Sequence, residues 1–206
     1  MGRVRTRGRP DDDGDGDDDG IGPRLRRYRE PVSSHLRLIE PRDAPELARA
    51  LTRNREFLAP WDPVRGDAYF TPEGQLSVIS SLLAQRSRGE AQPFVIVDEG
   101  AVVGRLTLSG IARGPSRSCD LGYWLSEDRN GRGIMTSAVG EAVDWAFGDA
   151  GLHRVQAGTL RHNVASQRVL QKAGFEQYGI APSYLEIAGR WQDHVLFQRV
   201  DDSTGR

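Results

Sequence analysis

Apolar and polar residues alternate along some segments of the chain and recur at helical spacing along others. Residues 35–39 alternate, which predicts a half-buried strand. Apolar residues recur every three or four positions after Asp43, and Glu46 three residues later predicts a capping box at the start of that helix. The whole pattern predicts, in order, a strand at 35–39, helices beginning at Asp43, Asn54 and Thr71, strands at 94–97, 102–108 and 119–125, a helix after Asn130, a strand at 154–159, a helix after Asn163, and strands at 177–187 and 191–200.

This order of elements is a mixed α/β pattern in which strands and helices share one chain without an internal repeat. The length of 206 residues is sufficient for one domain with a real core and too short for two ordinary domains with linkers. We therefore expect a single domain over residues 32–202, built as a mixed sheet flanked by helices.

The first thirty-one residues have a different composition. Arginine-rich segments flank the block from Asp11 to Asp19, which is interrupted only by glycines. Like charges at this density repel one another and bury no apolar surface, so we expect residues 1–31 to be a disordered charged tail. A solvated tail without a catalytic role is the interpretation that the composition favours. The alternatives are an acidic tail that attracts a basic protein substrate and one that folds back on the basic arms as an intramolecular shield.

A glycine-rich turn joins the strand predicted at 119–125 to the following amphipathic helix. It reads Asn-Gly-Arg-Gly-Ile-Met-Thr over residues 130–136. Gly131 and Gly133 allow a sharp turn and a close approach of the backbone to a ligand. The first helical turn leaves N–H groups unpaired at the positive end of the helix dipole, where a phosphate binds favourably. The turn therefore predicts an anion-binding loop.

Spacing excludes two common phosphate loops and favours a third. The chain has no Gly-Lys pair, which a P-loop requires, and Thr136 occupies the place of the last glycine of a dinucleotide fingerprint. The remaining pattern, Asn-x-x-Gly-x-Met over residues 130–135, resembles the pyrophosphate loop of the GNAT superfamily of N-acetyltransferases. The run from Asn163 to Phe175 is similar to the second signature of that family. Segments 54–61 and 189–193 resemble the Rim-type ribosomal-protein alanine N-terminal acetyltransferases most closely.

The resemblance implies a fold, a co-substrate and a set of binding residues. The implied fold is a mixed, mostly antiparallel, splayed sheet flanked by helices, whose strands part to admit acetyl-CoA. The family uses no metal, and the resemblance implies acetyl-CoA as co-substrate. The residues implied to bind it are Tyr123, Trp124, Leu125, Gly131, Arg132, Gly133, Ile134, Met135, Thr136, Asn163 and Ser166. A backbone N–H within 123–125 is implied to polarise the acetyl carbonyl, and Asn163 to meet the pantetheine arm.

The catalytic groups are less clearly indicated. Many family members carry a tyrosine acid seven residues after the motif asparagine, but Leu170 stands there. Rim-type enzymes carry a serine three residues after the asparagine, which makes Ser166 the candidate donor to the leaving thiolate, with a helix-capping role as its alternative. For the base we expect Glu56, with Glu186 second. Asp193 is a further candidate at the acceptor site.

Composition narrows the classes of function. Cys119 is the only cysteine, which excludes internal disulfides and sites with several thiolates, and the histidines lack metal-ligand spacing. A net charge of -1 gives no general attraction to nucleic acid or membranes. No apolar run approaches the roughly 20 residues that span a bilayer. The arginine-rich residues 3–9 lead into aspartates without the apolar segment of a signal peptide. We therefore expect a cytoplasmic protein.

Three functional interpretations remain at this point. The leading one is an N-acetyltransferase that moves acetyl from acetyl-CoA, by direct attack, to the α-amine of a protein such as a ribosomal protein. A second has the same chemistry with a small amine or antibiotic as acceptor. A third, which the missing tyrosine favours, is a CoA-binding module without catalysis. The chain is expected to act as a monomer or a homodimer.

Overall fold

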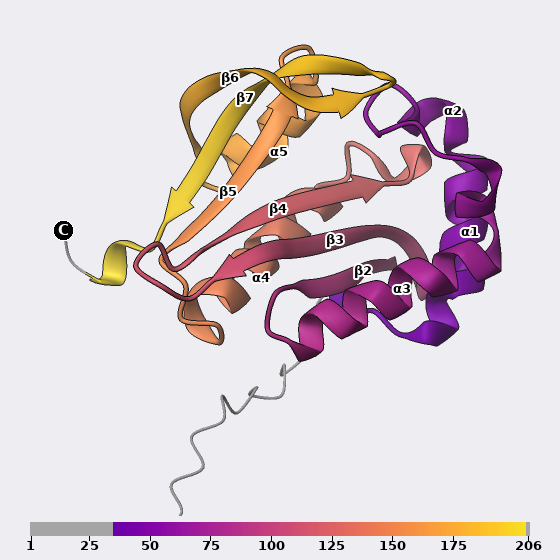
Figure 1. Ribbon diagram of the computed structural model, residues 1–206, viewed down its shortest axis with the longest axis horizontal. Coiled ribbons are helices and arrows are strands. Elements are labelled where there is room, and N and C mark those ends of the chain that lie inside the picture. The colour runs from indigo at the N-terminus through magenta and orange to yellow at the C-terminus, as the bar shows by residue number, and fades with distance from the viewer. Residues whose placement is uncertain (1–34, 205–206) are drawn as a thin grey trace, which may run out of the picture.

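The computed structural model describes residues 35–204, which form a sheet covered by helices on both faces (Figure 1). The strands are β1 (Leu36–Leu38), β2 (Gln92–Asp98), β3 (Ala101–Ala112), β4 (Ser118–Leu125), β5 (Arg154–Leu160), β6 (Glu176–Ile187) and β7 (Arg190–Val200). The helices are α1 (Ala44–Arg53), α2 (Arg55–Leu58), α3 (Pro72–Ser87), α4 (Ile134–Gly148) and α5 (Val164–Lys172), together with four short 3₁₀ turns. The predicted order of strands and helices is confirmed.

The seven strands are arranged in the order β1-β2-β3-β4-β5-β7-β6. All neighbouring pairs are antiparallel except β4 and β5, which are parallel. These two strands pair only where Ser118–Asp120 face Arg154–Gln156, and beyond that point they diverge (Figure 1). The second half of β4 is therefore bonded to β3 alone, as the predicted splayed sheet requires.

Each face of the sheet has its own core. Helices α4 and α5 pack on one face, where the larger apolar cluster includes Val139, Val143 and Leu170. Helices α1 and α3 cover the other face and contribute Leu47 and Ile79 to the smaller apolar cluster. Because side chains alternate along a strand, neighbouring residues of β4 belong to different cores. Tyr123 packs toward α4 and Trp124 toward the side of α1 and α3.

The predicted capping box at Asp43 and Glu46 is wrong. Asp43 is the last residue of the 3₁₀ turn Pro41–Asp43 and has helical dihedral angles, so its side chain does not cap α1. Its buried carboxylate instead accepts two hydrogen bonds from Arg37, at 2.6 and 2.8 Å. Glu46 accepts the backbone N–H of Val102 at 3.3 Å, which ties α1 to β3. A buried charge needs a charged partner, and that requirement decides where Asp43 points.

The predicted helix start at Thr71 is confirmed. Thr71 caps α3, because its hydroxyl accepts the backbone N–H of Gly74 at 3.0 Å. The last two strands form a hairpin whose turn uses Ala188 and Gly189, both with positive φ. The predicted tail, residues 1–31, lies outside the described residues, as does the predicted start of the domain at residue 32. Among the described residues no helix is long and apolar enough to cross a membrane.

Candidate active site

The glycine-rich turn precedes α4 as predicted, and the first N–H groups of the helix lie beside it. Gly131 and Gly133 have φ angles of +77° and +82°, a region that side-chain-bearing residues adopt only with strain. A Cβ at Gly133 would meet no atom within 4 Å, so there is open space in front of the loop. The first helical hydrogen bond runs from the Ser137 N–H to the Gly133 carbonyl, so the preceding N–H groups have no acceptor inside the helix. The geometry fits a pyrophosphate.

A groove of about 690 Å³ runs from this turn to the loop that follows α2. It passes along the part of β4 that has separated from β5. Because β4 pairs with β3 on one side only there, about half of its N–H groups in Leu121–Leu125 face the gap. Such N–H groups are suited to polarise a carbonyl in the groove.

Most of the residues that the sequence assigned to acetyl-CoA lie together along this groove. The lining includes Tyr123, Trp124, Leu125, Gly131, Gly133, Ile134, Met135, Thr136, Asn163 and Ser166. Arg132 is exposed and is not among the groove-lining residues. Met135 is buried and packs in the larger core, so its side chain does not crowd the loop.

The start of α5 is capped by Asn163. Its Oδ1 accepts the backbone N–H of Ser166 at 3.1 Å, which leaves the amide Nδ2 free to donate a hydrogen bond into the groove. The interpretation of Ser166 as the capping residue is therefore wrong. The Ser166 hydroxyl has another partner, the hydroxyl of Tyr123, at an oxygen–oxygen distance of 2.8 Å.

The Tyr123 hydroxyl reaches α5 from β4. Burial raises the pKa of Tyr123 to about 12, against the smaller opposing effect of its hydrogen bond with Ser166. Leu170, which stands where many family members carry their tyrosine, is fully buried in the core. A phenol is thus present near Ser166, but it comes from a different element.

The other end of the groove is rich in aromatic side chains. Phe57, Trp61, Tyr69 and Trp124 line it, together with Arg105. The Trp61 ring lies 5.3 Å from the His162 ring, which links this end to the segment before α5. Within the described residues, Arg105 Nη1 and Trp124 Nε1 are buried without a hydrogen-bond partner.

The sequence matches the family described as acetyltransferase (GNAT) domain over residues 35–176. The chain belongs to the GNAT acetyltransferase family. It is 38% identical over 164 residues to YjcK, a probable N-acetyltransferase of Bacillus subtilis, which covers 79% of this chain and 91% of that protein. It is 35% identical over 163 residues to the ribosomal protein uS5-alanine N-acetyltransferase of Escherichia coli, which covers 78% and 84% respectively.

A solved structure of Mycobacterium smegmatis RimJ in complex with CoA-disulfide superposes with a TM-score of 0.79 at 33% identity, over 83% of each chain. The predicted family, its Rim-type relatives and the fold are thereby confirmed. GNAT enzymes are acetyl-CoA-dependent acyltransferases, and acetyl-CoA is the co-substrate of this acetyltransferase.

The structure does not bring the predicted base or the predicted acceptor-site aspartate into the groove. Glu56 on α2 and Glu186 on β6 are exposed, and neither lines the groove. Asp193 accepts the backbone N–H of Ser183 at 3.0 Å, where β6 changes register, and also lies 3.7 Å from Arg161. Its contacts fix the β6–β7 pair and leave it outside the groove lining.

Sequence reasoning missed the charged residues of this acetyltransferase that line the groove, which are Asp62, Arg105, Arg129, Arg168 and Lys172. Arg168 and Lys172 are four residues apart on α5, so they share one face of the helix. This i, i+4 pair of cationic residues in the helix after Asn163 could have been recognised in the sequence as a basic face beside the proposed acetyl-CoA site. Asp62 carried no local signal, because its position depends on contacts with residues far along the chain. No cluster of metal-binding side chains occurs within residues 35–204.

Proposed function

We propose that this acetyltransferase acetylates the α-amine of a protein N-terminus, with a ribosomal protein as the acceptor class. The observation that carries the proposal is one continuous groove that joins the open anion loop at Gly133 to an aromatic-lined acceptor end, with the Ser166 hydroxyl among its lining residues. The similarity to enzymes named as ribosomal-protein alanine acetyltransferases supports the choice of acceptor.

Different residues of the groove bind different parts of acetyl-CoA. The N–H groups at the start of α4 hold the pyrophosphate, with Arg168 and Lys172 adding positive charge from α5. Asn163 donates its side-chain N–H to the pantetheine arm, since its oxygen is used by the cap. The free N–H groups of β4 polarise the acetyl carbonyl where negative charge develops.

The chemistry is a direct transfer. The neutral amine attacks the acetyl carbon, the new C–N bond replaces the C–S bond, and the electron pair of that bond leaves with sulfur. The nitrogen gives its surplus proton to water as the amide forms. An α-amine has an unperturbed pKa of about 8, so water can take its proton near neutral pH. Ser166 donates a hydrogen bond to the departing thiolate, which lowers the energy of the transition state.

The test is turnover with defined acceptors. The enzyme is incubated with acetyl-CoA and a peptide whose N-terminal residue is alanine, the same peptide already N-acetylated, or spermidine. Release of free CoA and a single acetyl group on the alanine peptide alone are expected. Faster turnover of spermidine would assign the enzyme to small amines, and CoA binding without turnover of any acceptor would indicate a binding module.

A second test addresses the acceptor in the cell. Intact masses of ribosomal proteins are compared between the parent strain and a strain that lacks this chain. Loss of one acetyl group from at least one ribosomal protein N-terminus is expected. An unchanged set of masses would contradict a ribosomal acceptor while leaving other protein N-termini open to the peptide assay.

A further inference from the structure

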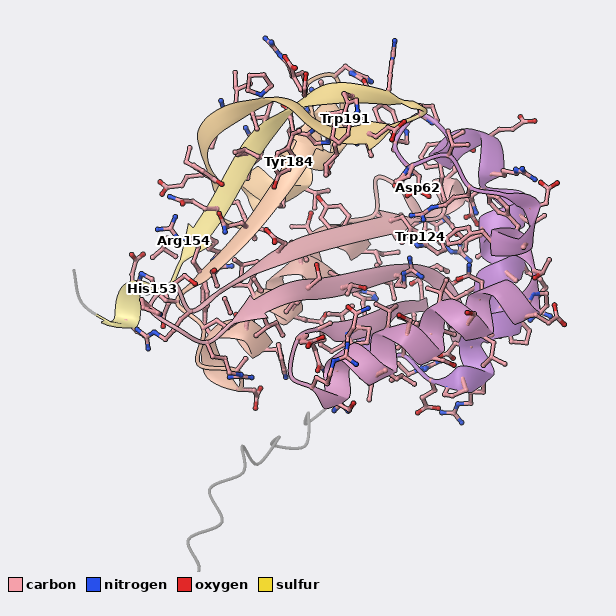
Figure 2. All side chains as sticks on the ribbon, viewed as in Figure 1. Asp62, Trp124, His153, Arg154, Tyr184 and Trp191 are labelled. Atoms are coloured by element: carbon pink, nitrogen blue, oxygen red, sulfur yellow. The ribbon has the colours of Figure 1, made fainter. Side chains whose placement is uncertain are left out.

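The residues that line the groove include one carboxylate, that of Asp62. The other charged residues in the lining are cationic, namely Arg105, Arg129, Arg168 and Lys172. A groove that must accept both an anionic co-substrate and an amine needs cations for the first and an anion for the second. Asp62 stands at the acceptor end, on the loop after α2, in the same region as Trp124 (Figure 2).

The position of Asp62 is fixed from two sides. Its backbone carbonyl accepts the N–H of Ala188 at 3.1 Å, which binds the loop to the β6–β7 turn. Its Oδ2 accepts the Nε–H of Arg65 at 3.1 Å, and the guanidinium of Arg65 lies 4.7 Å from the centre of the Tyr69 ring. Within the described residues no donor is found for Oδ1. The carboxylate is therefore held in place while one oxygen stays available.

The surroundings of Asp62 suit a protonated amine. Phe57, Trp61 and Tyr69 line the same end of the groove, and aromatic faces attract cations. The side chain of Asp62 is 41% exposed, so a ligand can reach it without displacing the loop. An ammonium group that enters this end meets one fixed acceptor among apolar rings.

We propose that Asp62 binds the α-ammonium group of the acceptor through Oδ1 and directs its nitrogen toward the acetyl carbon. This inference rests on the proposed function and names the residue that selects its acceptor. Once water has removed one proton from the ammonium, a remaining N–H keeps its hydrogen bond to the carboxylate. Asp62 is thus a substrate-binding residue, and it selects an amine over an acceptor without a positive charge.

The first experiment compares Asp62→Asn with a matched control, Asp67→Asn. Asp67 lies on the same connection, pairs with Arg55 at 2.7 Å and does not line the groove. For the alanine peptide, Asp62→Asn is expected to lower kcat/KM by about 10- to 100-fold, mainly through KM, because a charge-assisted hydrogen bond is lost. The KM for acetyl-CoA and Tm are expected to stay near their wild-type values, and Asp67→Asn is expected to behave as wild type.

The second experiment measures binding without turnover. With CoA present, calorimetry compares the alanine peptide with its des-amino analogue, which lacks the ammonium group. The wild-type enzyme and Asp67→Asn are expected to prefer the amine, and Asp62→Asn is expected to lose that preference. Asp62→Glu, which keeps the charge on a longer side chain, is expected to retain part of it.

The outcomes separate this inference from the proposed function. An undiminished amine preference in Asp62→Asn would overturn the role of Asp62 even if the peptide is acetylated. A preference that depends on Asp62 without any turnover would overturn the proposed catalysis and keep the amine site. If Asp62→Asn does not fold, the same binding comparison is made with Asp62→Glu. In that variant, an unchanged preference for the amine and an unchanged KM for the alanine peptide would contradict an amine site that depends on the position of the Asp62 carboxylate.

Discussion

The hydroxyl oxygens of Tyr123 and Ser166 lie 2.8 Å apart and connect β4 to α5 across the divided sheet. The Tyr123 hydroxyl also lies 3.4 Å from the carbonyl oxygen of Ser166, which can only accept. The phenol has one hydrogen, and the proposed mechanism requires that it be donated to Ser166 Oγ, the nearer of these two oxygens. In that arrangement the hydrogen of the Ser166 hydroxyl is free to point into the groove, and Tyr123 orients the group that we propose as donor to the thiolate.

Tyr123→Phe keeps the ring packing and removes the donor. We expect kcat to fall about 2- to 10-fold, which corresponds to the net value of one hydrogen bond, with little change in acetyl-CoA affinity. Because burial holds the pKa of Tyr123 at about 12, the phenol stays protonated at neutral pH. The ratio of wild-type to variant kcat should therefore be constant across the neutral range. Steady-state kinetics at several pH values measure it, and a ratio that changes with pH would contradict an orienting role.

Ser166→Ala removes the proposed donor itself. We expect kcat and kcat/KM to fall alike by about 10²-fold, the low end for a proton-donating group, because the interaction exists mainly in the transition state. The cap of α5 is retained, since it uses the backbone N–H of residue 166 and the side chain of Asn163. The Tyr123→Phe, Ser166→Ala double variant should lose no more activity than Ser166→Ala. Independent, multiplying losses would show that the two hydroxyls do not act together.

Local chemistry explains why so much of the fold was readable from the sequence. The apolar stripe of α4, the Thr71 cap and the positive-φ glycines 131 and 133 each depend on residues a few positions apart. The wrong prediction of a capping box at Asp43 also concerned neighbouring residues. There the pairing of the buried carboxylate with Arg37 outweighed a standard cap. A buried charge costs more than a missing cap, so the pairing decided the local geometry.

The acceptor end of the groove could not be predicted in this way, because it is formed by contacts between residues that are far apart in the sequence. Asp62 is placed by Ala188, and Trp61 by His162. The partner of Ser166 is a tyrosine 43 residues away. Residue spacing gives no information about such pairs, whereas the co-substrate loop is continuous in sequence. The position of the glycine-rich loop before α4 was therefore predicted, whereas Asp62, the carboxylate that lines the groove, was missed.

Arg168 and Lys172 should contribute to acetyl-CoA binding through their charge. Changing either to Gln is expected to weaken binding about 1.5- to 5-fold, the range for exposed charge pairs, and to reduce the dependence of Kd on salt. The control is Arg49→Gln, an exposed arginine on α1 that does not line this groove. Calorimetric titration at two salt concentrations provides the measurement. Equal salt dependence in all three variants and the wild type would exclude contact between α5 and the phosphates.

Asn54 should matter for stability more than for chemistry. Its buried side chain donates to the Ala50 carbonyl at 2.8 Å and to Ser126 Oγ at 3.2 Å, and accepts the Glu127 N–H at 2.9 Å. Asn54→Ala leaves these partners unsatisfied and is expected to lower the free energy of unfolding by about 1–3 kcal/mol. Ser126→Ala removes one of the three bonds and should cost less. Urea denaturation measures the free energy of unfolding of both variants. Equal losses in the two variants would show that the Asn54 bonds to Ala50 and Glu127 contribute little.

The anion loop gives the sharpest test of co-substrate binding, because the chain offers a matched control for backbone strain. Gly133 and Gly151 have φ angles of +82° and +62°, and a Cβ at either would meet nothing within 4 Å. Glutamate at either position therefore carries a similar strain, of about 1–2 kcal/mol, and comparable losses of Tm are expected. Only Gly133→Glu places a carboxylate beside the N–H groups at the start of α4. It should weaken acetyl-CoA binding at least about tenfold through repulsion and obstruction, whereas Gly151→Glu should bind as the wild type does. Calorimetry on folded protein measures both, and equal affinities in the two variants would mean that the pyrophosphate binds away from this loop.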